Sequence, residues 1–372
     1  MNYYIIVGEA SGDLHASNLI KEIKKKDAQA NIRAWGGDLM AAQGATIVKH
    51  YRELAFMGFA EVLMNLPTIL SNIKNCKKDI ESFQPDVLIL VDYPGFNMRM
   101  AKWAHQQSLK VVYYISPQVW AWKKGRVHQI KEYVDQMIVI LPFEKDFYAT
   151  YNYEVSYVGH PLLDALPTVA KNHQDFIDKH QLGDQPMIAL LPGSRKQEIS
   201  KMLGVMLTQI PLFPDYQFVI AGAPGINDSF YTDIINKLDV HIVMDETQAL
   251  LQHSHAALVT SGTATLETAL IGVPEVVCYK GNRISYEIAK RIVSIKYISL
   301  VNLIMDKEVV KELIQSEFNN KNLQQELQKI LSGKDRTDML QEYESLHKKL
   351  GDGGASERAA EIIVHSLNPK DN

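Results

Sequence analysis

Two short apolar runs, one in each half of the chain, stop abruptly at turns rich in small residues. The first is Tyr3–Val7, followed by Gly8–Asp13 (Gly-Glu-Ala-Ser-Gly-Asp), and the second is Met187–Leu191, followed by Pro192–Arg195 (Pro-Gly-Ser-Arg). An apolar run that ends this way and precedes a helical pattern is typical of a buried parallel strand. Ligands of open α/β sheets bind at the carboxyl ends of such strands. The sequence therefore predicts two half-sites that face one cleft.

The first half alternates apolar runs with helical patterns, which predicts a parallel sheet with helices on both faces. The expected strands are Tyr3–Val7, Ile32–Trp35, Val87–Val91, Val111–Tyr114 and Met137–Ile140. The expected helices are Asp13–Lys25, Asn97–Ser108, Lys123–Tyr133 and Glu144–Tyr151.

The alternation restarts after Gly159–Asp184, which we interpret as a linker because it combines glycine, prolines and polar residues. The strands expected there are Met187–Leu191, Phe218–Ala221, His241–Val243, Ala257–Thr260 and Glu275–Cys278, and the helices are Glu198–Gln209, Asp228–Leu238, Gly262–Ile271 and Ser285–Val293. Beyond Lys307 the pattern is helical and polar, up to a last helix at Ser356–Leu367. Because 372 residues exceed what one core usually supports, we expect two domains, 1–165 and 166–345.

The composition argues against several classes of function. A formal net charge of -4 makes a nucleic-acid backbone an unsuitable main partner. The two cysteines, Cys76 and Cys278, lack metal-ligand spacing and fit a reducing compartment. The N-terminus enters a strand without signal-peptide features, and no apolar run reaches the length of a spanning helix. We expect a cytoplasmic protein that can still touch a membrane.

The segment Ser261–Glu267 (Ser-Gly-Thr-Ala-Thr-Leu-Glu) follows an apolar strand and opens a helix. Free backbone N–H groups and the helix dipole at such a start favour an anion, typically phosphate. Glu267 could then accept hydrogen bonds from ribose hydroxyls. The alternative is an ordinary Ser/Thr helix cap.

Pro192–Arg195 offers a tight turn, the Ser194 hydroxyl and a guanidinium at the end of another strand. Arginine suits bidentate contact with phosphate oxygens, and the alternative is an ordinary arginine of a surface loop. Together with the Ser261 loop the phosphate interpretation gains support, because both loops would meet on one sheet edge. No Gly-x-Gly-x-x-Gly or Walker A pattern occurs.

Asp92 ends a five-residue apolar strand and stands where a general base is needed if an acceptor hydroxyl binds at the first sheet. A turn aspartate that orders the Pro94-Gly95 bend explains it equally well. His15, His128 and His160 are rival candidates for the base, and each also fits a structural histidine.

The turn Gly8–Asp13 places two glycines and two carboxylates between a strand and a helix. Its glycines allow close approach of a ligand to the backbone. Glu9 could bind acceptor hydroxyls, and Asp13 would favour the helix start through the dipole. A well-capped first helix is the alternative.

The segment from Phe56 to Leu70 carries a single charge and, as a helix, would be apolar on nearly every face. It is too short to span a bilayer and contains Pro67. Either it is buried against its neighbours, or it offers an apolar surface to acyl chains or a bilayer interface.

These motifs, taken together, resemble the lipid-A-disaccharide synthases. In the order found in that family the chain carries Gly8–Asp13, Val91–Asn97, Ser116–Trp122, Leu141–Glu144, Gly159-His160, Leu191–Glu198 and Ser261–Glu267, and Ser299–Leu303 and Val310–Gln315 are similar too. The Glu-Ala-Ser-Gly-Asp and Ser-Pro-x-Val-Trp-Ala-Trp strings are the most specific. The resemblance runs from residue 8 to about residue 315.

The resemblance implies an α/β protein of the GT-B fold, with two Rossmann-like domains whose parallel sheets face an interdomain cleft. Residues 1–165 would bind the acceptor and lipid, 166–345 would bind the UDP-sugar, and a helix at about 350–367 would pack back on the first domain. It implies an inverting hexosyltransferase that joins UDP-2,3-diacylglucosamine to 2,3-diacylglucosamine 1-phosphate (lipid X) and releases UDP. No metal or other cofactor is expected. The expected location is the cytoplasm, at the inner face of the cytoplasmic membrane, and a homodimer is one assembly that the sequence leaves open.

The resemblance also implies roles for single residues. Asp92 would take the proton of the acceptor 6-hydroxyl, and Arg195 would stabilise the departing UDP diphosphate. UDP would be held by Ser194, Ser261, Gly262, Thr263 and Glu267, with Asn302 nearby, and Glu9 and Ser11 would contact the sugar. Contact with acyl chains or the membrane would fall to Phe56, Met57, Phe59, Leu63 and Leu66.

One departure from the family's pattern concerns the base. Members often read Ala-Pro-Asp-Phe-Asn after this aspartate, whereas the chain reads Tyr-Pro-Gly-Phe-Asn over Tyr93–Asn97. The second carboxylate is therefore absent, which concentrates the prediction on Asp92. Alternatives are another UDP-sugar protein of the same architecture, such as a UDP-N-acetylglucosamine 2-epimerase or the peptidoglycan transferase, and a non-catalytic lipid- or nucleotide-binding protein. The Gly-Gly-Thr-Gly-Gly-His start expected of the peptidoglycan transferase is missing.

Overall fold

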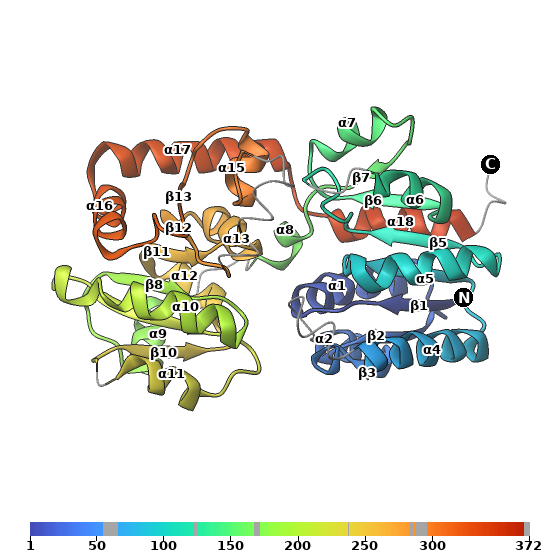
Figure 1. Ribbon diagram of the computed structural model, residues 1–372, viewed down its shortest axis with the longest axis horizontal. Helices are drawn as coiled ribbons and strands as arrows, with labels where there is room; N and C mark the ends of the chain where they lie inside the picture. The colour runs from blue at the N-terminus through green and yellow to red at the C-terminus, as the bar shows by residue number, and fades with distance from the viewer. Residues whose placement is uncertain are drawn as a thin grey trace. The chain divides into compact units, whose positions relative to one another are not determined.

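A computed structural model describes residues 1–54, 66–121, 125–166, 172–236, 238–282, 286 and 296–367 (Figure 1). The chain divides into two compact units. Unit 1 comprises Met1–Ala165 together with Leu350–Asn372, and unit 2 comprises Leu166–Lys349. Each unit is an α/β domain built on its own parallel sheet, which confirms the predicted fold class.

The described strands of unit 1 form a seven-stranded parallel sheet in the order β3-β2-β1-β4-β5-β6-β7. Their bounds are β1 Asn2–Ile6, β2 Asn31–Gly36, β3 Thr46–His50, β4 Val87–Val91, β5 Val111–Tyr114, β6 Gln136–Val139 and β7 Ser156–Tyr157. The central strand β4 is buried along its whole length, since helices cover both faces of the sheet. That double burial explains its uninterrupted Val-Leu-Ile-Leu-Val sequence.

The helices of unit 1 are α1 Ala10–Lys26, α2 Asp38–Ala42, α4 Leu66–Phe83, α5 Pro94–Gln106, α6 Arg126–Tyr133, α7 Glu144–Ala149, α8 Leu162–Ala165 and α18 Ala355–Leu367, with a 3-10 turn at Tyr51–Glu53. The C-terminal helix α18 packs against α1 and α8 (Figure 1). Asp164 fixes the start of α18, because its carboxylate accepts hydrogen bonds from the backbone N–H groups of Gly354 and Ser356.

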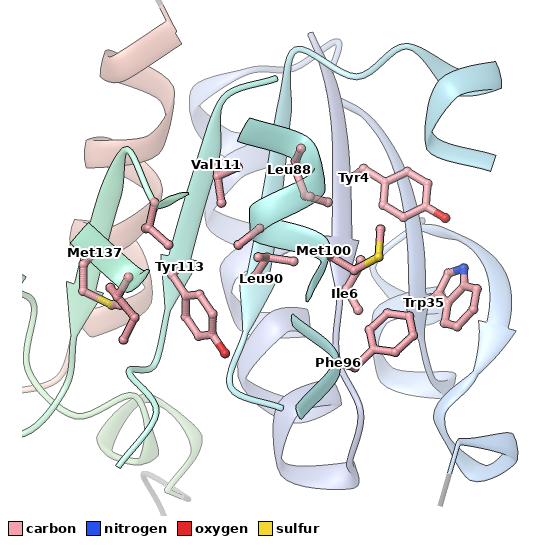
Figure 2. Close-up of a cluster of buried hydrophobic side chains, with 14 of the residues drawn as sticks. Tyr4, Ile6, Trp35, Leu88, Leu90, Phe96, Met100, Val111, Tyr113 and Met137 are labelled. Atoms are coloured by element: carbon pink, nitrogen blue, oxygen red, sulfur yellow. The ribbon is translucent and has the colours of Figure 1, made fainter. Parts of the chain in front are cut away.

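The other face of this sheet carries a large apolar core beneath α4, α5 and α6 (Figure 2). From the strands it receives Tyr4, Ile6, Leu88 and Leu90, and from α5 it receives Phe96 and Met100; all six are buried. The rings of Trp35 and Phe96 stack with their centroids 5.4 Å apart. Phe96 therefore anchors the start of α5 to the sheet, just after the turn that carries Asp92.

The described strands of unit 2 form a six-stranded parallel sheet in the order β10-β9-β8-β11-β12-β13. Their bounds are β8 Met187–Leu191, β9 Gln217–Gly222, β10 His241–Met244, β11 Ser254–Thr260, β12 Glu275–Tyr279 and β13 Lys311–Ile314. The helices are α9 His173–His180, α10 Lys196–Leu207, α11 Asp228–Ile235, α12 Thr247–Gln252, α13 Thr263–Ile271, α15 Leu300–Met305, α16 Asn320–Leu331 and α17 Gly333–Leu350, with a 3-10 turn at Ile210–Leu212.

Some sequence predictions were wrong. The expected linker Gly159–Asp184 contains the helices α8 and α9, and the polar region after Lys307 contains the strand β13. Strands β3 and β7 were not predicted either. The three missed strands β3, β7 and β13 lie at the edges of their sheets, so they lack the continuous apolar sequence of a central strand. The predicted helix Ser285–Val293 lies almost entirely outside the described residues.

Within the part of the chain that the structure describes, no helix has the length and apolar character needed to cross a bilayer.

Candidate active site

Asp92 lies directly after β4 in a turn of unusual backbone conformation. Asp92 and Tyr93 both have positive φ angles, 47° and 49°, a region that non-glycine residues rarely adopt. The turn is held by the Asn97 amide, which donates to the carbonyl oxygens of Asp92 (2.8 Å) and Val91 (3.2 Å). The Tyr113 hydroxyl also donates to the Asp92 carbonyl at 2.5 Å. Strain sustained by so many contacts is typical of functional turns.

The electrostatic surroundings of Asp92 raise the pKa of its carboxyl to about 6. Burial is the largest cause, and the negative charge of Glu9 is the second. Glu9 follows β1, which pairs with β4 in the sheet, so the fold brings together the two carboxylates that the sequence placed at separate strand ends. A carboxylate with a pKa near 6 is a stronger base than an ordinary aspartate and is still mostly ionised at pH 7.

Glu9 and Ser11 stand at the beginning of α1. Glu9 occupies the N-cap position with an extended backbone, and its side chain makes no capping hydrogen bond. Ser11 lies in the first turn of the helix, and both side chains are partly exposed. Two polar groups are thus presented at the same sheet edge as Asp92.

Asp13 lies in the first turn of α1, as expected, and it has a second structural role. Its carboxylate is buried and accepts hydrogen bonds from the backbone N–H groups of Gly37 (2.8 Å), Leu39 (3.1 Å) and Met40 (3.2 Å). These N–H groups belong to the start of α2, so Asp13 caps that neighbouring helix as well as lying in the first turn of its own.

The three histidines considered as rival bases lie in other environments. His15 and His160 are buried with their ring centroids 6.5 Å apart, and burial lowers their pKa values to about 4 and about 3. His160 Nδ1 accepts a hydrogen bond from the Leu162 N–H. His128 is exposed on α6 and contacts the Tyr151 ring. The geometry therefore favours Asp92.

The sequence did not indicate a role for Glu144, although Glu144 is the last residue of Leu141–Glu144, one of the segments that resemble the family. Its carboxylate is buried and accepts from the backbone N–H groups of Ile140 and Leu141 and from the Trp120 indole at 3.3 Å. Burial raises its pKa to about 7. Glu144 thereby joins the segments that follow β5 and β6.

In unit 2, the turn after β8 is organised by Glu198. Gly193 has φ +114°, and the Glu198 carboxylate accepts hydrogen bonds from the Ser194 N–H (3.2 Å) and from Arg195 Nη1 (2.8 Å). The glycine is required, because a Cβ at position 193 would lie 2.8 Å from Glu198 Oε2. Glu198 is the second supporting residue that sequence reasoning missed; its only signal was its place at the end of a family-like string.

The turn after β11 lies beside the turn after β8, because the two strands pair with Leu191 opposite Val259. Ser261 is fixed by its N–H, which donates to Cys278 O, and by its hydroxyl, which donates to Ile298 O at 3.2 Å. Gly262 precedes α13 without a side-chain cap, and Thr263 is its first residue. The start of α13 thus resembles an anion-binding helix terminus more than a capped one.

Glu267 projects from α13 and is partly buried. Burial raises the pKa of its carboxyl, while Gln248 Nε2 donates to Oε1 at 2.8 Å. The two oxygens of a carboxylate together offer about four acceptor positions. The Glu267 carboxylate can therefore accept hydrogen bonds from a ligand in addition to the one from Gln248.

Asn302 is completely buried and its amide is saturated. Its oxygen accepts from the N–H groups of Val309 and Val310, and its nitrogen donates to Val310 O and to Glu312 Oε1. Glu312 also accepts from the N–H groups of Ile298 and Ser299. Asn302 therefore reaches the Ser261 turn through Glu312 and the Ile298 segment.

The residues predicted to meet lipid fall largely outside the described part of the chain. The structure does not describe Phe56, Met57, Phe59 and Leu63. Leu66 is the first residue of α4. Within the described ranges, no group of three or more His, Cys, Asp or Glu side chains is placed to hold a metal ion.

A family model and individual relatives all assign the chain to one protein family. A sequence model of that family, lipid-A-disaccharide synthetase, matches residues 3–365. The lipid-A-disaccharide synthase of Syntrophus aciditrophicus (strain SB) is 38% identical over 375 residues, which cover 99% of this chain and 98% of the relative. That of Geobacter metallireducens is 37% identical over 373 residues, covering 98% and 97%.

Solved structures of low sequence identity share the fold. The UDP-GlcNAc 2-epimerase of Neisseria meningitidis bound to UDP-GlcNAc superposes with a TM-score of 0.67 at 15% identity, covering 100% of both chains. The calicheamicin glycosyltransferase CalG4 gives 0.61 at 13% identity, covering 100% of this chain and 99% of the other. These similarities confirm the GT-B fold.

Proposed function

The chain belongs to the lipid-A-disaccharide synthase family, and from this membership we propose that it condenses UDP-2,3-diacylglucosamine with 2,3-diacylglucosamine 1-phosphate (lipid X). Family membership makes it a glycosyltransferase of lipid A biosynthesis. The proposed products are the β-(1→6)-linked disaccharide 1-phosphate and UDP.

In the proposed reaction the 6-hydroxyl oxygen of the acceptor attacks the anomeric carbon of the donor. The new carbon–oxygen bond forms as the bond to the UDP diphosphate breaks, and the configuration at that carbon inverts. Asp92 takes the hydroxyl proton, while Glu9 and Ser11 contact the sugar. General-base assistance of this kind contributes about 10²–10⁴-fold to a rate.

The UDP leaving group falls to unit 2. Arg195 and the N–H groups at the start of α13 supply positive charge for the diphosphate, and Ser194, Ser261, Gly262 and Thr263 line the same sheet edge. Glu267 accepts from the ribose. Asn302 does not touch UDP in this proposal; its hydrogen bond to Glu312 supports the Ile298 segment, which holds Ser261. These groups would replace a metal ion, so the reaction is proposed to be independent of metal.

The observation that carries this proposal is the position of Asp92. The Asp92 carboxyl has a pKa of about 6 and lies in the strained turn directly after the central strand of unit 1, near the Glu9 carboxylate that follows the neighbouring strand. Carboxylates with raised pKa values at the carboxyl ends of parallel strands are typical of catalytic sites.

The test measures UDP release from UDP-2,3-diacylglucosamine with and without lipid X, in neutral mixed micelles that contain EDTA. Release that requires lipid X supports the reaction and its independence from metal. Asp92→Asn should bind UDP normally and lose about 10²–10⁴-fold in turnover. Unchanged turnover in that variant would contradict the assignment of Asp92 as the base. UDP binding without any release of UDP in the presence of lipid X would show that lipid X is not the acceptor.

We also propose that the protein acts at the inner face of the cytoplasmic membrane, because both substrates are lipids. The sequence from Phe56 to Leu66 is the proposed contact, since it is apolar and leads into α4, whose first residue is Leu66. Met57→Asp and Leu63→Asp should reduce retention on phospholipid vesicles without changing UDP affinity. Equal retention of variants and wild type contradicts the membrane contact.

A further inference from the structure

Unit 1 contains a cavity of about 440 Å³. Its lining residues come from α4, α5 and α6, the helices that cover one face of the sheet, and from the turn before α5. The lining residues that bear on its chemistry include Ile69, Tyr93, Phe96, Arg99, Lys102 and Arg126. None of these residues has a role in the function proposed above. The volume fits a sugar-sized group or a few methylene segments.

The lining carries positive charge only. Arg99 and Lys102 come from α5 and Arg126 begins α6, while none of the described lining residues is an aspartate or a glutamate. Lys102 Nζ lies 5.7 Å from the centre of the Tyr133 ring, so one of its neighbours is an aromatic face. Two guanidinium groups and an ammonium group facing one hollow are suited to a phosphate monoester.

The rest of the lining is apolar or aromatic, with Ile69 from α4 and Phe96 and Met98 from α5. A cavity for a free inorganic ion needs no such surface. Charge and apolar surface in one hollow match an amphiphile that carries a phosphate next to hydrocarbon.

The cavity adjoins the proposed base. Tyr93, which lines it, is the residue after Asp92, and the Tyr113 hydroxyl that holds the Asp92 carbonyl lies within the electrostatic influence of Arg126. Burial raises the pKa of the Tyr93 phenol, and the charge of Arg99 opposes that rise, which places this guanidinium near the same turn. A ligand here therefore lies next to the turn that carries the base.

We infer that this cavity binds the phosphate of the acceptor, with Arg99, Lys102 and Arg126 as its recognition groups and the apolar lining against the adjoining acyl chains. This inference rests on the function proposed above and extends it by assigning the acceptor end of the reaction to named residues. If the cavity binds this phosphate, the phosphate contributes to acceptor specificity, because an acceptor without it is not attracted by the three cationic side chains.

The test compares two acceptors, 2,3-diacylglucosamine 1-phosphate and the same molecule without its phosphate, in neutral detergent micelles. Arg99→Gln combined with Lys102→Gln should raise the KM for the phosphorylated acceptor about ten-fold or more. The same variant should change the KM for the dephosphorylated acceptor less than about two-fold, because the lost contact is absent there already. Lys145→Gln, an exposed lysine of α7 outside the cavity, is the charge-matched control and should behave as wild type with both acceptors.

Equal losses with both acceptors would overturn the inference, because a general structural defect acts on either molecule. Arg126→Gln, which changes a residue of α6, is a second test variant. An unchanged circular-dichroism spectrum and melting temperature show that unit 1 of each variant is folded. The phosphate that the cavity binds could instead belong to a lipid headgroup of the bilayer. Binding of the variants to vesicles with and without phosphatidylglycerol distinguishes this source from the acceptor. Variants that lose only the binding to anionic vesicles and keep the acceptor KM would assign the cavity to bilayer headgroups and refute the inference. A wild-type protein with no acceptor-dependent UDP release would contradict the proposed function itself; in that case equilibrium binding of the two acceptors, with the same variants, decides the cavity.

Discussion

The ring of Tyr93 lies directly over Gly8, so closely that a Cβ at position 8 would stand 2.2 Å from Tyr93 Cγ. Gly8 follows β1 and Tyr93 follows β4, and these strands are neighbours in the sheet. Tyr93 also stacks on Phe96 with ring centroids 5.7 Å apart. One aromatic ring therefore joins the turn that carries Glu9 to the turn that carries Asp92.

Gly8→Ala should displace Tyr93 and, with it, Asp92. Overpacking of this kind costs about 1–3 kcal/mol of unfolding free energy. We expect a lowered melting temperature together with a reduced kcat, while UDP affinity stays unchanged. Gly204→Ala is the control, because a Cβ there meets no atom within 4 Å in α10 and the substitution improves helix propensity. Full activity in Gly8→Ala would show that the turn tolerates a shifted ring.

Asp92→Asn should stabilise the protein at pH 7 even though it impairs turnover. The folded-state pKa of about 6 exceeds the ordinary 3.8, so the folded state binds more protons than the unfolded state between about pH 4 and pH 6. Stability therefore falls as the pH rises through that window, and the ionised carboxylate costs up to about 3 kcal/mol at pH 7. Denaturant unfolding at pH 7 and pH 4 should show the gain at pH 7 alone; a loss of stability at pH 7 would contradict burial of the carboxylate as the cause of its raised pKa.

Glu9→Gln should shift the acidic limb of the pH profile of kcat/KM to lower pH. The negative charge of Glu9 contributes to the raised pKa of Asp92, and removal of that charge makes the Asp92 carboxyl more acidic. The profile is measured from pH 4.5 to pH 8, a range chosen to bracket about pH 6. An unmoved limb would mean that a group other than Asp92 titrates there.

Glu198→Ala should weaken donor binding and leave acceptor binding unchanged. The carboxylate holds both the Ser194 N–H and the Arg195 guanidinium, so its removal frees the turn after β8. We expect the Kd for UDP to rise about ten-fold. Glu198→Gln keeps an oxygen for the Ser194 N–H and should lie between wild type and alanine. Parallel increases in the acceptor KM would indicate a wider disturbance.

Asp13→Ala should destabilise unit 1 by about 2–4 kcal/mol, because three backbone N–H groups lose a charged acceptor. Asp38→Ala tests an exposed aspartate at the start of the same helix and should change stability by less than about 1 kcal/mol. Equal effects of the two substitutions in urea unfolding would rule out the capping role of Asp13.

The predictable part of the fold is the set of central strands. Val87–Val91 and Met187–Leu191 have the predicted bounds, because a strand buried on both faces needs an unbroken apolar sequence. The edge strand β13 was missed because its Lys-Glu-Leu-Ile sequence contains Glu312, whose burial is compensated by hydrogen bonds from Ile298, Ser299 and Asn302. Such compensation is a property of the assembled unit.

The candidate site divides in the same way. The sequence predicted that Asp92, Glu9, Ser194 and Ser261 follow the ends of strands, where parallel sheets bind ligands. The segments that resemble the family contain the same residues. Nothing in the sequence indicated that Asp13 caps α2, that Glu198 holds Arg195, or that Asn302 is enclosed by its own neighbours. Each of these contacts joins backbone groups and side chains whose positions depend on how the turns are folded.

By itself, then, the sequence determined the alternating α/β architecture, the family and the strand ends where polar residues gather, because these follow from local periodicity and short motifs. Tertiary structure decided the rest. The pKa of Asp92 depends on burial and on Glu9, which lies more than 80 residues away along the chain. The cationic cavity likewise draws Ile69, Arg99 and Arg126 from three helices. Electrostatic energy and cavity shape depend on distances through space, and only packing of the helices on the sheet sets those distances.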